Sequence, residues 1–183
     1  MRLYKQTIQD FALYAGLELT DEAYENLISS AAMMSARMRA VRIVSASSVS
    51  KRDLEQRLVY KGEDPECAKA AVEWMCELNL LDDRRTADQI VRKCASKGYG
   101  IARARQALFE KQIPKDCWDD VLRDYPDQTE HIVDFISTKL PKKFDRKDVQ
   151  KVTNALIQRG HSYSDVRSAM QQFTSMDETW EEE

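Results

Sequence analysis

Residues 80–125 read LLDDRRTADQIVRKCASKGYGIARARQALFEKQIPKDCWDDVLRDY, and this stretch predicts three short helices in succession. Asp83 is predicted to cap the first helix and Gly98 to end it, because glycine adopts the left-handed conformation at low cost. The second helix follows Gly100, and Pro114 either ends it or opens the third helix, because proline is tolerated only in a helix's first turn. The apolar residues recur at helical spacing: Ala87, Ile90, Val91 and Cys94, then Ile101, Ala104 and Leu108, then Cys117, Trp118, Val121, Leu122 and Tyr125. None of these short helices buries its apolar stripe alone, so the three are expected to pack on one another and on neighbouring units.

The same three-helix pattern recurs on both sides of this stretch. Aligning the second helix of each unit superimposes Leu58, Leu108 and Leu156, which are 50 and 48 residues apart. The aligned positions around these leucines are Leu54, Ala104 and Val152, then the basic residues Lys61, Lys111 and Arg159, then the turn residues Gly62, Gln112 and Gly160. Self-similarity at a fixed period of this size is typical of repeat proteins.

We therefore predict an all-α protein: an elongated array of three tandem three-helix repeats that follows a short N-terminal helical extension. Only five glycines and four prolines occur in 183 residues, which also favours helices. The predicted parts are an extension over 1–34, repeats over 35–81, 82–126 and 127–176, and an acidic tail over 177–183. Residues 1–12 are compatible with a short helix or a strand.

Helix caps are predicted at the starts of several helices. Thr20 precedes Asp21 and Glu22, a favourable first turn for a helix that runs on through the methionine-rich stretch. Ser50 with Asp53, and Asp145 with Asp148, are predicted to form capping boxes, and Ser162 or Ser164 is predicted to cap the last helix.

Charge alternates along the chain. Between Arg84 and Lys115 nine basic residues stand against Asp88 and Glu110, a local charge of +7 on a protein whose net charge is −3. Segments 33–62 and 139–159 each carry +5, whereas 63–83 and 116–134 each carry −6. If equivalent helices line one side of the array, the basic segments form a continuous positive face.

The middle basic segment supplies the candidate binding residues. Arg84 and Arg85 face the positive end of a helix dipole, an unfavourable position that points to function. The complete candidate set is Arg84, Arg85, Arg92, Lys93, Lys97, Arg103, Arg105 and Lys111. The alternative for any one of them is a solvated side chain whose stem covers the core.

No motif indicates catalysis or a bound cofactor. The four cysteines are dispersed without a CxxC pair, and His131 and His161 are isolated from any ligand spacing. The sequence has no zinc pattern, Gly-rich phosphate loop, HExxH or GxSxG. We expect a protein that is not an enzyme and needs no metal or cofactor.

Hydropathy indicates a cytoplasmic protein without a membrane partner. No apolar run approaches the roughly 18 residues of a membrane span. The first ten residues, MRLYKQTIQD, lack the apolar core of a signal peptide.

Five motifs follow one another between Ala15 and Phe173. They are GLELTDEAYENLI, SKRDLEQRLVYKG, LLDDRRTA, KGYGIARARQALFEKQIP and NALIQRGHSYSDVRSAM. In this order they resemble the motifs of the RecX family, bacterial regulators of the RecA recombinase. Two positions depart from the family pattern: Thr86 stands where Phe or Tyr is usual, and Gln112 stands where a turn glycine is usual. In a left-handed turn Gln112 would cost about 1 kcal/mol relative to glycine.

The resemblance implies a monomer that lies in the groove of the RecA–DNA filament. It implies suppression of the filament's ATPase, strand-exchange and coprotease activities, and through them control of DNA repair and recombination. The implied partners are the RecA filament and, as an open question, single- and double-stranded DNA. A basic helical-repeat protein that acts on naked DNA is the alternative, and a pure protein-interaction scaffold comes third. Selective affinity for assembled RecA separates the first reading from the second, in which binding to naked DNA falls steeply with salt.

Overall fold

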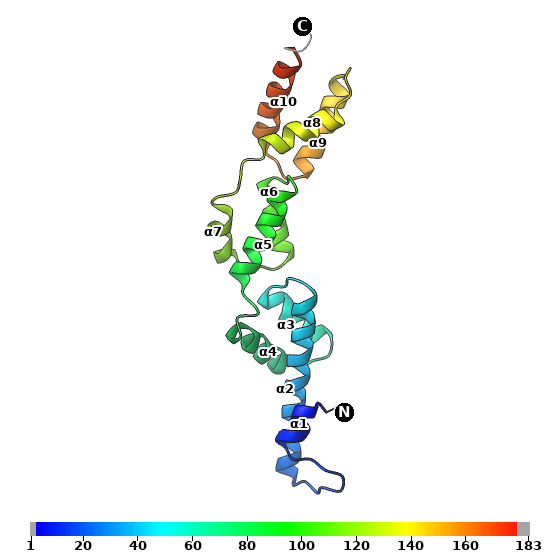
Figure 1. Ribbon diagram of the computed structural model, residues 1–183, viewed down its shortest axis with the longest axis vertical. Coiled ribbons are helices and arrows are strands. Elements are labelled where there is room, and N and C mark those ends of the chain that lie inside the picture. Colours follow the sequence, from blue (N-terminus) through cyan, green and yellow to red (C-terminus); the bar gives the residue numbers. More distant parts are fainter. Residues whose placement is uncertain (1–2, 179–183) are drawn as a thin grey trace. The chain divides into compact units, whose positions relative to one another are not determined.

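The computed structural model describes residues 3–178. Within these residues every regular secondary-structure element is a helix (Figure 1). The chain forms two compact units, Met1–Thr86 and Ala87–Glu183. The predicted all-α class is therefore confirmed. Along residues 3–178 no helix is both long enough and apolar enough to cross a bilayer.

Over its described residues, 3–86, the first unit contains four complete helices: α1 (Lys5–Asp10), α2 (Asp21–Ala46), α3 (Lys51–Tyr60) and α4 (Pro65–Glu77). Helix α2 packs against α1, α3 and α4. The buried core of the first unit includes Ala36, Ala40, Val49, Leu54, Leu58, Ala71 and Met75. The segment 1–12, compatible with helix or strand in the sequence, thus contains a short helix.

Helix α2 is continuous across the predicted boundary between the extension and the first repeat. Its 26 residues include both 34 and 35. Thr20 caps it as predicted, because its hydroxyl oxygen accepts the N–H of Ala23 at 3.2 Å. The extension therefore continues directly into the first helix of repeat 1.

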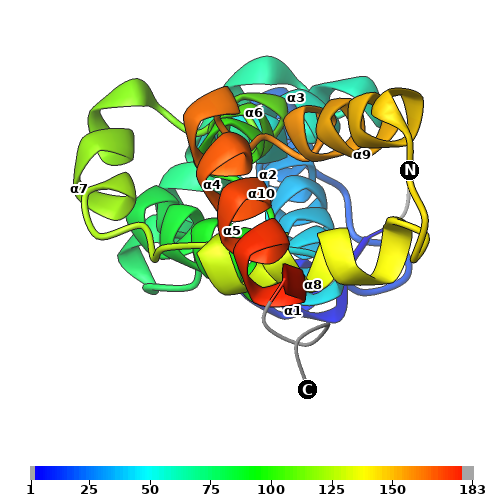
Figure 2. The same ribbon diagram turned by 90° about the horizontal axis from the view of Figure 1, so that it is seen from above.

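The second unit contains repeats 2 and 3. Helix α5 (Asp83–Ser96) begins at the end of the first unit and continues into the second. It is followed by α6 (Ile101–Glu110), a 3₁₀ turn η1 (Lys115–Cys117), α7 (Trp118–Leu122), α8 (Thr129–Lys139), α9 (Arg146–Gln158) and α10 (Tyr163–Glu178). Helix α10 packs against α8 and α9, as the second view shows (Figure 2).

Each of these two repeats has its own core. The core of repeat 2 contains Ala87, Val91, Cys94, Ala104, Leu108, Ile113 and Leu122. The core of repeat 3 contains Ile132, Ile136, Leu140, Val152, Leu156, Val166 and Ala169. The apolar residues predicted for repeat 2, and Val152 and Leu156 of repeat 3, therefore lie in or pack against these cores. Of the predicted acidic tail 177–183, residues 177 and 178 end α10, and 179–183 lie outside the described residues.

The third helix of repeat 2 is shorter than its apolar pattern suggests. Only Trp118–Leu122 is α-helical, after the 3₁₀ turn that follows Pro114. Tyr125 lies beyond this helix but still packs on the core, and its hydroxyl donates to the Tyr99 carbonyl at 2.7 Å. The apolar spacing therefore identified core residues correctly and the helix length incorrectly.

The second helix of every repeat ends with the same hydrogen-bond pattern. The N–H groups of Gly62, Gln112 and Gly160 donate to the third residue before them, at 2.9 Å in each case. The next N–H groups, of Glu63, Ile113 and His161, donate to the carbonyls of Leu58, Leu108 and Leu156. This is the Schellman arrangement, which requires a left-handed residue at the turn.

The turn residues have φ values of +88°, +53° and +89°. Gln112 thus adopts the predicted left-handed conformation, and the aligned repeat is confirmed at the level of the backbone.

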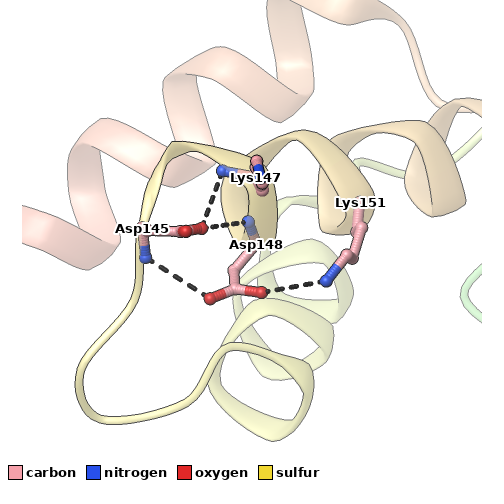
Figure 3. Close-up of polar contacts among 4 residues, drawn as sticks. All are labelled: Asp145, Lys147, Asp148 and Lys151. Carbon is pink, nitrogen blue, oxygen red and sulfur yellow. Dashed lines mark hydrogen bonds and ion pairs between the residues drawn. The ribbon is translucent and has the colours of Figure 1, made fainter.

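The capping box of repeat 3 is formed as predicted (Figure 3). The Asp145 carboxylate accepts the N–H groups of Lys147 and Asp148 at 2.8 and 2.9 Å. The Asp148 carboxylate accepts a hydrogen bond from the Asp145 N–H and forms an ion pair with Lys151 at 3.2 Å. The Asp145 N–H, and then Lys151, lower the pKa of Asp148.

Candidate functional site

The eight candidate residues do not lie in one structural unit. Arg84 and Arg85 belong to the first unit, whereas the other six belong to the second. Within the second unit, Arg92, Lys93 and Lys97 lie on or just after α5, and Arg103, Arg105 and Lys111 lie on or just after α6. The two groups are described separately below.

Arg84 and Arg85 are exposed in the first turn of α5. The Asp82 carboxylate accepts their backbone N–H groups at 2.8 and 3.3 Å. A carboxylate at this position offsets the unfavourable interaction between the two cations and the helix dipole. The first turn of α5 therefore presents two arginines whose backbone N–H groups are both hydrogen-bonded.

The prediction that Asp83 caps α5 is wrong, because Asp82 does so. Asp83 is the first residue of α5 and is buried. Its carboxylate accepts the Lys51 N–H at 2.8 Å and so contributes to the N-terminus of α3, where Ser50 also accepts the Asp53 N–H. Asp83 thus ties the start of α5 to the second helix of repeat 1. Thr86, one of the two positions that depart from the pattern the sequence resembles, is also buried.

Three candidate cations of the second unit lie in and after α5 and are all exposed. Arg92 forms an ion pair with Asp88 one turn earlier, at 2.9 Å. An exposed pair of this kind contributes little to stability and leaves the guanidinium accessible. Lys93 and Lys97 extend the basic character toward the end of the helix.

Arg103 and Arg105 have different environments, although the sequence grouped them together. Two residues apart on a helix correspond to about 200° of rotation. Arg103 is half-buried and forms an ion pair with Glu110 at 3.3 Å, and Gln106 also donates to Glu110. Arg105 is exposed. Arg105 is therefore the better candidate for contact with a partner, because the Arg103 guanidinium is already paired with Glu110. Lys111 is half-buried at the end of α6.

Repeats 2 and 3 are joined by a direct backbone contact at Gly100 and Gly160. The N–H of Gly100 donates to the Arg159 carbonyl at 3.0 Å, and the N–H of Ala102 donates to the Gly160 carbonyl at 3.2 Å. The start of α6 thus caps the end of α9, an arrangement in which the positive end of one dipole meets the negative end of another. A Cβ atom on either glycine would overlap the backbone of the other repeat.

The Arg159 side chain also contacts both repeats at this junction. Its guanidinium lies 5.0 Å from the centroids of the Tyr99 and Phe135 rings, which come from repeats 2 and 3. It also donates to the Lys97 carbonyl at 3.3 Å. The sequence identified Arg159 only as the basic residue of its turn. Gly100 did carry a signal, because a glycine stands where Ser50 caps the equivalent helix, and such a glycine indicates close backbone approach.

His161 is buried at the junction. Its Nε2 atom lies 3.1 Å from the Gly98 carbonyl oxygen, which only accepts hydrogen bonds, so Nε2 carries the proton. Burial lowers the pKa of His161, and the bond to Gly98 opposes this effect in part. Burial likewise raises the pKa of Tyr125, whose hydroxyl is bonded to Tyr99, to about 12.

We expect the stability of the second unit to fall as the pH decreases below about 6.5, the ordinary pKa of histidine. A lowered pKa in the folded state means that the unfolded chain binds the proton first, so acid favours unfolding. Urea unfolding at pH 7.5 and pH 5.5 measures this difference, and His161→Gln should reduce it. If the stability of the wild-type protein rises between pH 7.5 and pH 5.5, the lowered pKa of His161 does not control it.

The cysteines are free, and burial raises the pKa of the Cys67, Cys76 and Cys94 thiols. Among residues 3–178 no three His, Cys, Asp or Glu side chains gather in a way that could hold a metal ion.

Comparison with known proteins identifies the family. A family model described as "RecX, second three-helix domain" matches residues 82–122. The regulatory protein RecX of Xanthomonas campestris pv. campestris (strain B100) is 30% identical over 134 residues, which cover 72% of this chain and 83% of the relative. The chain belongs to the RecX family. The regulatory protein RecX of Vibrio parahaemolyticus is 27% identical over 140 residues, or 75% of this chain and 90% of the relative.

Solved RecX structures share the fold. A crystal structure of regulatory protein RecX superimposes with a TM-score of 0.73 and 20% identity, covering 92% of this chain and 86% of the other. The crystal structure of RecX from Lactobacillus salivarius gives a TM-score of 0.69 and 19% identity, covering 78% and 97%. The resemblance inferred from the five motifs is thus confirmed, and the relatives are named as regulatory proteins.

Proposed function

We propose that this RecX-family protein is a negative regulator of the RecA recombinase. In this role it binds the groove of the RecA–DNA filament and inhibits ATP hydrolysis, strand exchange and coprotease activity. The observation that carries the proposal is the family relationship, which extends over 83% of a relative named regulatory protein RecX. The exposed cations Arg85, Lys93 and Arg105 support it, because a filament that contains DNA presents negative charge.

The effect on ATP hydrolysis tests the proposal. Purified protein is titrated into RecA that is saturated on single-stranded DNA, and the rate of ATP hydrolysis is followed. We expect inhibition at ratios at or below one protein per RecA subunit, without any added metal beyond that required by RecA. An unchanged rate across the whole titration would refute the proposed function.

Binding to naked DNA is the second candidate function. It is favoured by the run of exposed basic side chains in and after α5, whose cations would neutralise phosphates. In that case affinity for bare DNA falls steeply with salt, and RecA adds nothing to it.

Arg105→Ala is expected to weaken filament binding about tenfold, because a charge-assisted contact contributes about 1–3 kcal/mol. Stability should change by no more than about 0.5 kcal/mol, since the side chain is exposed. Arg123→Ala is the matched control: Arg123 is also exposed in repeat 2 but lies in the acidic segment and pairs with Asp120. Equal affinities of the two variants for the filament would show that Arg105 is only a solvated residue.

A further inference from the structure

Each repeat exposes one large apolar side chain at the same position of its second helix. The aligned leucines Leu58, Leu108 and Leu156 are completely buried. The residues directly after them are Val59, Phe109 and Ile157, with exposed fractions of 41%, 70% and 40%. Because the three helices end in the same Schellman pattern, these side chains occupy equivalent places in their repeats.

This recurrence distinguishes the three residues from other exposed apolar side chains. Tyr60 is 91% exposed, but its equivalents are the polar residues Glu110 and Gln158. Exposing a large apolar group to water is unfavourable. Single exposed apolar residues are common on protein surfaces, so it is the recurrence at one position of all three repeats that points to a binding role.

The charges beside these residues do not recur. One helical turn before Phe109 stands Arg105, but the equivalent residue beside Val59 is Glu55. Glu110 directly follows Phe109 and is exposed. The neighbouring charges therefore offer a polyanion no attraction common to the three positions, and Val59 and Ile157 have no ring on which a base could stack. Apolarity is therefore the common property, and it suits a protein partner better than a nucleic acid.

We propose that Val59, Phe109 and Ile157 are apolar anchors that insert into pockets on protein subunits of the filament, rather than onto its DNA. This inference rests on the proposed function and names, repeat by repeat, the side chains that contact protein. A partner assembled from identical subunits offers the same pocket repeatedly, which matches one anchor per repeat. Anchors of this kind contribute a large share of interface affinity when they are fully desolvated.

Phe109 gives the sharpest test, because its side chain is the most exposed of the three and its removal leaves the core intact. Binding is measured to RecA–single-stranded DNA filaments and to naked single-stranded DNA under the same salt conditions. Phe109→Ala should lower filament affinity about tenfold or more and leave the affinity for naked DNA unchanged. Ile157→Ala should act in the same direction. Tyr163→Ala is the control, because Tyr163 is an exposed aromatic residue of the second unit outside the repeated position.

Phe109→Leu separates apolar insertion from base stacking. Leucine keeps an apolar side chain but has no ring, so this variant should bind filaments nearly as well as the wild type. Equal loss of naked-DNA binding in Phe109→Ala and Phe109→Leu would overturn the inference in favour of stacking. Wild-type filament affinity in Phe109→Ala would overturn it as well. A wild-type protein without affinity for filaments would instead refute the proposed function itself.

Discussion

Gly160→Ala is expected to lower the free energy of unfolding of the second unit by about 2–5 kcal/mol. A non-glycine residue at φ +89° costs about 1–2 kcal/mol. The added Cβ would also overlap the backbone of Arg103, and overpacking of this kind costs about 1–3 kcal/mol. Relief of the overlap requires that the start of α6 separate from the end of α9, which would break the two backbone hydrogen bonds between the repeats.

Gly62→Ala is the matched control for this variant. Gly62 occupies the same turn of repeat 1 with a φ of +88°, but a Cβ there would have nothing within 4 Å. Its replacement should therefore cost only the conformational part, about 1–2 kcal/mol. Gly100→Ala tests the overlap alone, because Gly100 has a φ of −74°. If calorimetry finds equal losses for Gly160→Ala and Gly62→Ala, the junction between repeats 2 and 3 does not contribute to stability.

Leu108→Ala should lower the free energy of unfolding by about 2–5 kcal/mol, the range for truncation of a fully buried leucine. Leu108 has no exposed surface and packs in the core of repeat 2 with Ala104, Ile113 and Leu122. Truncation leaves a cavity that the surrounding short helices fill only in part.

The neighbouring Phe109→Ala supplies the control in a stability measurement. Phe109 is 70% exposed, so its truncation should change the free energy of unfolding by no more than about 0.5 kcal/mol. Urea unfolding of the two variants compares adjacent positions that face opposite environments. Similar losses for both would mean that the register of α6 is wrong.

Much of the fold was predictable because it depends on local rules. Apolar spacing located the cores around Leu58, Leu108 and Leu156, and the repeat alignment located the left-handed turn at Gln112. Thr20 caps its helix as its position before two acidic residues suggested. These features are set by a few neighbouring residues, so a single sequence contains them.

Contacts between distant segments were not predictable in the same way. Gly100 and Gly160 are far apart in the sequence, and nothing local specifies which segment of backbone each of them approaches. By sequence alone, Asp82 and Asp83 are equally good caps for α5. The position of α3 in the fold decides between them, because the Asp83 carboxylate accepts the Lys51 N–H and Asp82 is left to cap α5. The short α7 reflects the 3₁₀ turn before it, which apolar spacing does not reveal.

The candidate site was predictable in composition but not in detail. A count of charges located the basic segment, and the structure adds that Arg92, Lys93 and Arg105 are exposed; their role in binding stays a prediction. The count could not show that Arg103 pairs with Glu110 and lies against Gly160. A count of charges also does not detect Phe109, an exposed apolar side chain in the same segment.

Binding to filaments compared with naked DNA tests the central claim most directly. The wild-type protein is titrated onto RecA–single-stranded DNA filaments and onto the same DNA without RecA, at physiological ionic strength. We expect the filament to be bound at least about tenfold more tightly, which corresponds to about 1.4 kcal/mol of selectivity for assembled RecA. Equal affinity for both, with binding that falls steeply as salt is raised, would contradict the account and indicate a protein that acts on naked DNA.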